Sequence, residues 1–393
     1  MSLRKTPPAK RMESVRRATD RLPRDGMPRR RRILLVGDAA NPNVQRWVRH
    51  CVSVGYETYL FTCATDAPDI PGVHRVEASA WLWLPGPLTY LLSVPRLRRT
   101  VRTIAPDIVH AHYGGGYGVM GALSGSSALV ISLWGSDVLV SPARSRIRAA
   151  LLRWMLRQAV AVCVNSRHLA QAAAAYTALP IHLTYFGVEP LFYTHHAGER
   201  GPREPLRLAT VKTFTPNSGI DTLLSAMRRV KDAGIAVSLV AVGPDPGGRA
   251  GGLAREMDLG DSVRFVGLAP PATVAEVMRS SDIYVQPTSF AEGFGIAVVE
   301  AQACWLPAIV SNIGGLVEAV DPTSGTVVPP RDPDAFAAAI IRFANDQQRL
   351  DDARRHARTF AEGFRWETVA PAMDAVYDMI ARPVEAPEGP GSA

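Results

Sequence analysis

Residues 291–303 read AEGFGIAVVEAQA, an apolar run with two glycines near its start and a glutamate near each end. A helix over 293–303 would place Glu292 and Glu300 roughly 12 Å apart along its axis. That distance is too long for two carboxylates that act on one glycosidic bond. It suits a long ligand that has hydroxyl groups at each end, which would donate hydrogen bonds to the two carboxylates. The glycine amides and the helix N-terminus would bind an anion between those ends.

A second interpretation of the two glutamates is structural. Glu292 alone fits a surface residue near a helix cap. Glu300 fits a solvent-facing position less well, because it is set among apolar residues, where a carboxylate is costly unless it has a partner. The chemistry therefore favours a binding role for the pair.

Short apolar runs separated by helical or glycine-rich segments fill most of the remaining chain. A chain of 393 residues is too long for one ordinary core, so we expect two domains. Strands are predicted in the first half at 33–37, 57–62, 107–113, 128–134 and 159–166, and in the second half at 206–211, 236–243, 263–267, 283–287 and 307–311. This alternation predicts an α/β fold of two doubly wound, Rossmann-like domains that face a cleft.

The predicted boundaries follow from changes in composition. We expect a disordered basic leader at 1–32, an N-terminal domain at 33–187, a linker at 188–205, a C-terminal domain at 206–365, a final helix at 366–382 and a disordered tail at 383–393. The tail is rich in Pro, Gly and Ala, which cannot build a packed core.

The positive charge is concentrated in the leader. Residues 1–32 contain 12 Lys or Arg and three acidic residues, a net charge of +9, while the whole chain is net +8. The rest of the chain is therefore close to neutral, which argues against a nucleic-acid partner. The leader has no apolar run, so it predicts neither a signal peptide nor a membrane anchor, and Met1 and Met27 are both candidate starts.

The four cysteines show no CxxC motif and no paired spacing. This usage predicts a reducing compartment, a cytoplasmic protein and no metal site, and we expect no cofactor. The most apolar window, residues 81–95, is interrupted by three prolines and is too short to span a bilayer.

A literal GxGxxG motif at 116–121 suggests a dinucleotide-binding dehydrogenase. It follows a later strand of the first half rather than the first one, and no second strand ends in an acidic residue at the proper distance. We therefore reject the dehydrogenase interpretation. What remains is a glycine-rich loop where backbone can approach a ligand closely.

Several motifs, in order along the chain, resemble the retaining glycosyltransferases of family 4, which have the GT-B fold. WGSD at 134–137 stands where many members have His-Gly-x-Asp, and FGVE at 186–189 resembles the interdomain stretch. EGFG…E at 292–300 resembles the E-x7-E motif, and GGLVE at 314–318 resembles the GGxxE segment. The resemblance covers nearly all of 33–381 and implies that the final helix crosses back to the first domain.

The resemblance implies a nucleotide-sugar donor held mainly by the C-terminal domain and an acceptor held by the N-terminal domain. Glu300 would bind the ribose hydroxyls and Glu292 would face the donor sugar. Lys212, in place of the usual arginine, would neutralise the diphosphate as charge builds on it. The candidate donor-binding residues are thus Lys212, Val266, Gly293, Phe294, Gly295 and Glu300, and the candidate catalytic residues are Glu292, Asp137 and His112.

Two positions depart from the family pattern. Asn217 and Ser218 stand where a second diphosphate-binding lysine is expected, and Arg249 is a candidate substitute for it. Trp134 replaces the usual histidine of His-Gly-x-Asp. His110 or His112 would line the cleft in its place, although either one fits a core histidine equally well.

The implied reaction is metal-independent transfer of a sugar with retention at the anomeric carbon. The acceptor would be a hydroxyl of a saccharide or lipid-linked molecule in cell-surface polysaccharide or glycolipid synthesis. Residues 78–188 hold ten arginines and two acidic residues, so an anionic membrane surface is a candidate partner and its inner face a candidate location. The alternatives are a sugar-nucleotide epimerase of the GT-B fold and a non-catalytic partner that binds nucleotide sugars.

Overall fold

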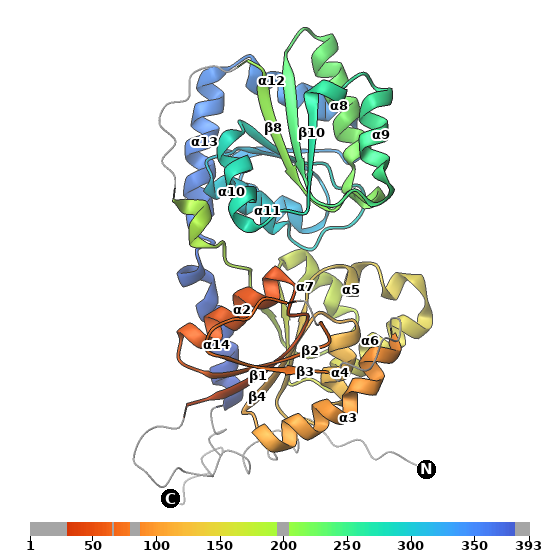
Figure 1. The fold of residues 1–393 in the computed structure, drawn as a ribbon, viewed down its shortest axis with the longest axis vertical. Coiled ribbons are helices and arrows are strands. Elements are labelled where there is room, and N and C mark those ends of the chain that lie inside the picture. The colour runs from red at the N-terminus through yellow and green to blue at the C-terminus, as the bar shows by residue number, and fades with distance from the viewer. Residues whose placement is uncertain (1–29, 65–66, 79–86, 195–203, 382–393) are drawn as a thin grey trace, which may run out of the picture. The chain divides into compact units, whose positions relative to one another are not determined.

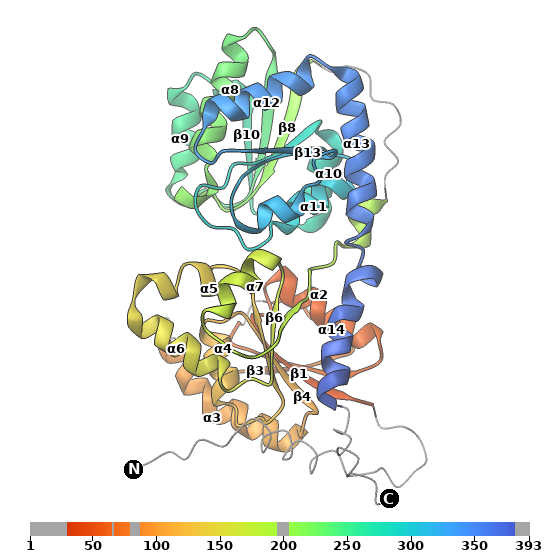
Figure 2. The same cartoon turned by 180° about the vertical axis from the view of Figure 1, so that it is seen from behind.

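A computed structural model describes residues 30–64, 67–78, 87–194 and 204–381. The leader up to residue 29, the tail and the middle of the expected linker lie outside these residues. The chain divides into two compact units (Figures 1 and 2). Unit 1 comprises the chain up to Val164, residues 170–184 and the chain from Ala370, and unit 2 comprises residues 165–169 and 185–369.

Unit 1 is built on a parallel sheet that has seven strands within the described residues, in the order β3-β2-β1-β4-β5-β6-β7. The central strands are fully buried on both faces, as parallel strands covered by helices are. The strands are β1 (Arg32–Val36), β2 (Glu57–Thr62), β3 (Val73–Glu77), β4 (Ile108–His112), β5 (Leu129–Leu133), β6 (Ala161–Val164) and β7 (Ile181–Leu183).

Helices cover both faces of this sheet. They are α2 (Pro42–Ser53), α3 (Pro87–Ile104), α4 (Gly116–Leu123), α5 (Ser136–Leu139), α6 (Arg146–Leu156), the end of α7 (Arg167–Ala174) and the end of α14 (Trp366–Ala381), with a 3-10 turn at Pro142–Arg144. A Cβ at Gly121 of α4 would touch Ala111 of β4, whereas its neighbour His110 bonds to Tyr377 of α14. Since successive strand residues point to opposite faces, α4 and α14 cover opposite faces.

Unit 2 is a second parallel sheet, with the strand order β10-β9-β8-β11-β12-β13. Its strands are β8 (Leu206–Val211), β9 (Val237–Val242), β10 (Val263–Gly267), β11 (Ile283–Gln286), β12 (Ala308–Ser311) and β13 (Gly325–Val328). Its helices are α8 (Ile220–Asp232), α9 (Arg249–Glu256), α10 (Pro271–Ser280), α11 (Ile296–Ala303), α12 (Pro333–Ala344) and α13 (Gln347–Glu362). Short 3-10 turns lie at Pro190–Tyr193, Pro216–Ser218, Pro246–Gly248, Gly260–Ser262 and Gly314–Ala319.

The predicted fold class is confirmed. Both sheets are parallel and doubly wound, with the crossover order expected of Rossmann-like domains. The final helix starts in unit 2, and from Ala370 onward it packs with unit 1, where Figure 2 shows it beside the sheet. Asp374 on this helix lies 3.1 Å from His50 of α2. The prediction that the terminal helix returns to the first domain is therefore confirmed.

The GxGxxG glycines have a packing role. A Cβ at Gly116 would lie 2.4 Å from the ring of Tyr90 on α3, and one at Gly118 would lie 2.6 Å from Met155 on α6. These contacts let α4 sit tightly between its two neighbours on one face of the sheet. Close helix packing therefore explains this motif without a dinucleotide.

In the part of the chain that the structure describes, none of the helices combines the length and the apolar character needed to cross a membrane.

Candidate active site

The central feature of unit 2 is an ion pair between Lys212 and Glu292. Lys212 follows β8 and Glu292 follows the adjacent strand β11, so both lie where the carboxyl ends of neighbouring parallel strands meet. Lys212 Nζ lies 2.6 Å from Glu292 Oε2 and donates to Thr288 Oγ1 at 2.7 Å. Both charged side chains are about one-fifth exposed, at 20% and 21%. Charge-assisted contacts of this length are the strong ones, and this one leaves both groups within reach of a ligand.

The loop that carries Glu292 is held in place by Gln286 and by the glycine pair at 314–315. Gln286 Nε2, at the end of β11, donates to Glu292 Oε2 at 3.1 Å, and Gly315 N donates to the Glu292 carbonyl at 3.2 Å. A Cβ at Gly314 would lie 2.3 Å from that carbonyl oxygen, and one at Gly315 would lie 2.0 Å from the Gly293 oxygen. The two glycines of the GGLVE stretch thus allow a backbone-to-backbone contact that holds the Glu292 loop.

Asn217 fixes the same loop from the other side. Its Nδ2 donates to the Ala291 carbonyl at 2.7 Å, and its Oδ1 accepts from the amides of Phe290 and Ala291 at 3.0 and 3.1 Å. Ser218 beside it is buried, and its hydroxyl accepts from Ile220 N at the start of α8. The residues that replace the expected lysine therefore organise the loop and the helix start.

The helix after Glu292 begins later than the sequence predicts. We expected it over 293–303, but α11 begins at Ile296. Gly295 has a φ of +88°, which an α-helix does not contain, so the helix can begin only after it. A Cβ at Gly295 would lie 2.5 Å from Leu316. Glu292 therefore lies on the loop before α11. The prediction that one helix spaces the two glutamates along its axis is wrong.

Glu300 lies on α11 and is buried, with 6% of its surface exposed. Burial raises the pKa of the neighbouring Tyr284, and the charges of Glu300 and Glu292 raise it further. Tyr284 stays neutral in consequence and donates its hydroxyl to Gln286 Oε1 at 2.8 Å. The charges of Glu292 and Glu300 therefore both act on the phenol of Tyr284.

The other predicted donor residues lie at the same end of the sheet. Gly293, Phe294 and Gly295 form the loop between Glu292 and α11. The ring of Phe294 is buried against Tyr185 and Phe364, and 1% of the whole residue is exposed. Val266 lies at the carboxyl end of the edge strand β10, with β9 between it and β8.

Asp137 belongs to unit 1 and is buried. Its carboxylate accepts from the backbone amides of Gly114 at 2.7 Å, Gly135 at 2.8 Å and Trp134 at 3.1 Å. Burial raises its pKa in spite of these bonds. In this geometry Asp137 ties the loop after β4 to the loop after β5, so its direct contacts are with the backbone of both loops.

His112 is also in unit 1, at the end of β4, and 1% of its surface is exposed. Burial lowers its pKa to about 3, and neither ring nitrogen has a hydrogen-bond partner among the described residues. Its ring lies 5.4 Å from that of Trp134 and 4.1 Å from that of His110. His110 itself contacts Tyr377 Oη at 2.7 Å and Ser132 Oγ at 2.8 Å. Both histidines are neutral core residues in this structure.

Two polar residues of unit 2 were missed by sequence reasoning, since Thr288 and Gln286 hold the Lys212–Glu292 pair directly. Gln286 ends the buried strand β11 and Thr288 follows two residues later, which is the signal that could have identified them. Glu318, the glutamate of the GGxxE segment, accepts from the amides of residues 167 and 168 at 2.8 Å each.

Two family descriptions match the chain in succession. Residues 32–166 match "Glycosyl transferase 4-like", and residues 194–360 match "Glycosyl transferases group 1". This chain belongs to the group 1, family 4-like glycosyltransferases. In this glycosyltransferase, the first match covers most of unit 1 and the second covers most of unit 2, including the Lys212–Glu292 pair.

Curated relatives of this chain are also named as glycosyltransferases. The glycosyltransferase is 29% identical to the D-inositol 3-phosphate glycosyltransferase of Jonesia denitrificans over 392 residues, which covers 87% of this chain and 92% of that protein. It is 39% identical to D-inositol 3-phosphate glycosyltransferase 2 of Catenulispora acidiphila over 126 residues, which covers 32% of this chain. That match spans 29% of the relative's length, under a third of it.

Solved structures share the fold. The sucrose-phosphate synthase of Thermosynechococcus elongatus superposes with a TM-score of 0.78 at 23% identity, covering 89% of this chain and 99% of that one. HepE of Anabaena, in complex with UDP-glucose, superposes with a TM-score of 0.73 at 18% identity, covering 89% and 99%. The glycosyltransferase therefore has the GT-B fold.

Proposed function

We propose that this glycosyltransferase moves a sugar from a nucleotide-sugar donor to a hydroxyl of a saccharide or lipid-linked acceptor, with retention at the anomeric carbon. The observation that carries the proposal is the Lys212–Glu292 pair, 2.6 Å apart at the carboxyl edge of the unit 2 sheet, with Glu300 buried on the next helix. Ligands of doubly wound domains bind at this edge. A cation for phosphate and two carboxylates for hydroxyls suit a nucleotide sugar.

In this proposal Lys212 binds the diphosphate of the donor. When the donor binds, the ammonium exchanges its contact with Glu292 for phosphate oxygens, and the amides at the start of α11 add further donors. Arg249, which is 57% exposed at the start of α9, is the second cation in this proposal. With these groups neutralising the leaving diphosphate, we propose that transfer needs no added metal and persists in EDTA.

The sugar and ribose ends use the two carboxylates. Glu292 accepts from the donor sugar's hydroxyls, and Glu300 accepts from the ribose hydroxyls. In the proposed step the acceptor oxygen forms a bond to the anomeric carbon from the face that the nucleotide leaves. The bond from that carbon to the phosphate oxygen breaks, and the acceptor proton passes to the departing phosphate. The configuration at the anomeric carbon is thereby kept.

The relatives suggest which substrates to test first. HepE holds UDP-glucose, which supports a uridine nucleotide as the donor here. The relatives named D-inositol 3-phosphate glycosyltransferases make a phosphorylated polyol the first small acceptor to try. The excess of arginine in residues 78–188 supports a lipid-linked acceptor, and with it a role in cell-surface polysaccharide or glycolipid synthesis. The four free cysteines fit a cytoplasmic location, either free or at the inner face of the membrane.

Nucleotide release is the experiment that tests the proposal. The full chain is incubated with UDP-, GDP-, dTDP- and ADP-sugars, with and without membrane lipid extract or inositol 3-phosphate, and Glu300→Ala serves as the inactive control. Acceptor-dependent release that this variant lacks supports transfer, and NMR of the product anomer tests retention. An altered sugar without any acceptor would instead indicate an epimerase. Tight binding of a donor without turnover would indicate a non-catalytic nucleotide-sugar-binding protein.

A further inference from the structure

Helix α3 of unit 1 exposes three leucines near its start. Leu88, Leu91 and Leu92 are 52%, 49% and 50% exposed. Their spacing of three and four residues puts them on one side of the helix. A cluster of half-exposed leucines is unusual on a surface that faces only water, because each one leaves apolar area unburied. These leucines form the apolar end of a longer stripe on α3.

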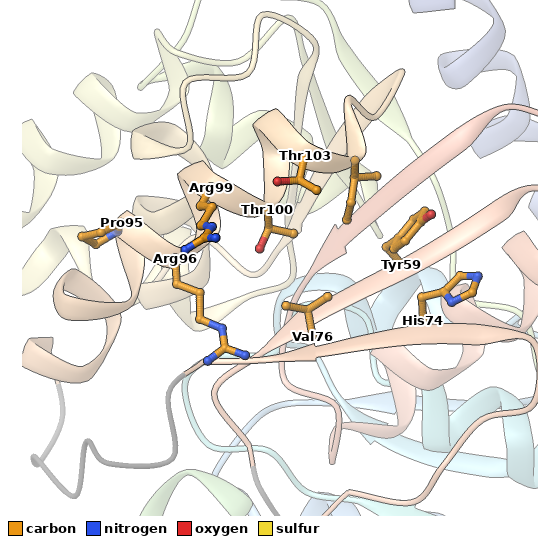
Figure 3. Close-up of a pocket in the computed structure, with 9 residues that line it drawn as sticks. Tyr59, His74, Val76, Pro95, Arg96, Arg99, Thr100 and Thr103 are labelled. Carbon is orange, nitrogen blue, oxygen red and sulfur yellow. The ribbon is translucent and has the colours of Figure 1, made fainter.

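The same side of α3 continues into a cationic groove. Arg96 lies four residues after Leu92, and Arg99 lies eleven residues, or about three turns, after Leu88. Both arginines line a groove of about 770 Å³ between α3 and the strands β2 and β3, of which β3 lies at the sheet edge. Figure 3 shows the two guanidinium groups beside Val76, with Tyr59 and His74 farther along the groove. Leucines and arginines therefore form one continuous stripe along α3.

Helix α6 repeats the combination on the same face of the sheet. Ile147 is 81% exposed and Leu151 is 45% exposed. The helix also carries Arg146, Arg148 and Arg153. Helix α4 packs between α3 and α6, as the contacts of its glycines with Tyr90 and Met155 require. The two amphipathic helices thus flank α4 on one side of unit 1.

Helices α3 and α6 carry arginines without acidic side chains, since neither contains an Asp or Glu. The two acidic residues in 78–188 are engaged elsewhere, since Asp137 is buried and Asp107 accepts from the backbone amide of Arg32 at 2.8 Å. The arginines of α3 and α6 therefore have no carboxylate on their own helices.

We propose that the face formed by α3 and α6 docks on an anionic lipid bilayer. The leucines of α3, with Ile147 and Leu151 of α6, enter the boundary between headgroups and acyl chains. Arg96 and Arg99 meet lipid phosphates at the groove. Apolar side chains and arginines on one face are the two features that bind peripheral helices to anionic membranes. An oligonucleotide would use the arginines but leave the leucines in water. This inference rests on the membrane location given in the proposed function and names the surface for it, and it can be tested whether or not sugar transfer takes place.

Vesicle flotation of the full chain tests the surface. The vesicles contain either phosphatidylcholine alone or phosphatidylcholine with about one-third phosphatidylglycerol. The wild type is expected to float only with the anionic vesicles and to be released by high salt. The double variant R96Q/R99Q is expected to lower the partition coefficient about 30-fold, because each arginine near an anionic surface contributes about 1 kcal/mol, or roughly fivefold. The variant L91Q/L92Q is expected to lower it at least tenfold without removing any charge.

The matched controls remove the same groups from unit 2. R255Q/R264Q removes two exposed arginines, and L268Q removes a leucine that is 86% exposed. Both are expected to float like the wild type, and circular dichroism confirms that each variant is folded. The basic leader offers a rival source of binding. Equal flotation of R96Q/R99Q, R255Q/R264Q and the wild type would assign binding to the leader and overturn the proposal. Loss of dimers in L91Q/L92Q without any vesicle binding by the wild type would instead make this face a protein interface.

Discussion

The ammonium of Lys212 lies 2.6 Å from Glu292 Oε2, and the two residues come from the ends of adjacent strands, 80 positions apart in the chain. Each charge is held by a neutral partner as well, Thr288 for the lysine and Gln286 for the glutamate. The pair is therefore a preorganised polar cluster. In the proposed function, the diphosphate binds the lysine of this cluster and the sugar binds its glutamate.

The first prediction concerns the cation of this pair. Lys212→Met is expected to lower kcat about 100-fold or more, because one preorganised charge at a leaving group is typically worth that much. Lys212→Arg is expected to stay within about tenfold of the wild type, since it keeps the charge and the family's usual residue is arginine. Glu292→Gln and the double variant Lys212→Met/Glu292→Gln complete a mutant cycle, measured by nucleotide release. Strictly additive losses would mean that the two residues act independently and would contradict the paired role.

The second prediction concerns Asn217, whose side chain makes three hydrogen bonds to residues 290 and 291. Asn217→Ala is expected to raise the donor KM and to lower kcat, each about tenfold. The reason is that the loop that positions Glu292 loses the hydrogen bonds of Asn217. Asn217→Asp keeps the two accepting bonds and loses one donating bond, so it is expected to recover part of the activity. The measurement is steady-state nucleotide release with varied donor. If both variants lost stability but kept wild-type kinetics, the residue would be only structural.

The third prediction concerns Arg249 as the second diphosphate cation. Its guanidinium lies 3.9 Å from Asp221 at the start of α8, and more than half of it is exposed. Arg249→Gln is expected to raise the donor KM roughly three- to tenfold, an effect that shrinks at high salt because the group is screened. Arg255→Gln, on the same helix, is the matched control and is expected to change neither kinetic constant. Equal KM values for the two variants would remove Arg249 from the site.

The strands that sequence reasoning missed share one position in the fold. β3, β7 and β13 all lie at sheet edges, where one side of the strand has no partner strand among the described residues. Their burial is only partial, so their sequences, such as VHRVE at 73–77, lack the continuous apolar run that marks a covered parallel strand. The central strands β4, β5, β11 and β12 are fully buried and were predicted correctly.

The candidate site residues of unit 2 could be picked out from the sequence one by one, but their contacts could not. Sequence and resemblance located Lys212, Glu292 and Glu300 separately, because each follows a recognisable strand or lies in a motif. Their pairing depends on strand order, since β8 and β11 become neighbours only when the sheet is assembled. The start of α11 was misjudged because a left-handed glycine at 295 has no local signature that distinguishes it from a helical one.

The fourth prediction compares two left-handed glycines at opposite ends of α8. Gly219 has a φ of +70°, and a Cβ there would lie 1.7 Å from the Pro287 carbonyl oxygen. Gly234 has a φ of +82°, and a Cβ there would have nothing within 4 Å. Gly234→Ala is expected to cost about 1 kcal/mol from backbone strain alone. Gly219→Ala is expected to cost several times more and to displace the strand end that leads to Glu292.

Calorimetry of the two variants checks this comparison. Gly234→Ala is expected to lower the Tm by a few degrees and leave nucleotide release unchanged. Gly219→Ala is expected to unfold at a clearly lower temperature and to lose activity below its Tm as well. Similar Tm values for the two variants would show that the loop after β11 yields to a methyl group, and that Gly219 is not needed for close packing.

The last prediction uses the buried histidines of unit 1. Burial holds the pKa of His112 at about 3 and that of His110 well below 6.5, the usual value, whereas the unfolded chain takes up protons near 6.5. A histidine that stays neutral in the folded state does not change the free energy of unfolding above pH 6.5, because the unfolded chain is neutral there as well. Below it, each such group weakens folding by about 1.4 kcal/mol per pH unit. Stability of unit 1 should therefore fall as the pH drops from 6.5 to 5, by about 2 kcal/mol from His112 and by a further amount from His110.

His112→Leu separates this effect from that of the carboxylates. Its stability, measured by urea unfolding between pH 7 and 5, is expected to depend less steeply on pH than that of the wild type, by about 1.4 kcal/mol per unit. His356→Leu, an exposed residue of α13, is the matched control and is expected to keep the wild-type slope. An unchanged slope in His112→Leu would mean that His112 gains its proton in the folded state. The ring nitrogens would then have to find an acceptor that the described core beside Trp134 does not offer.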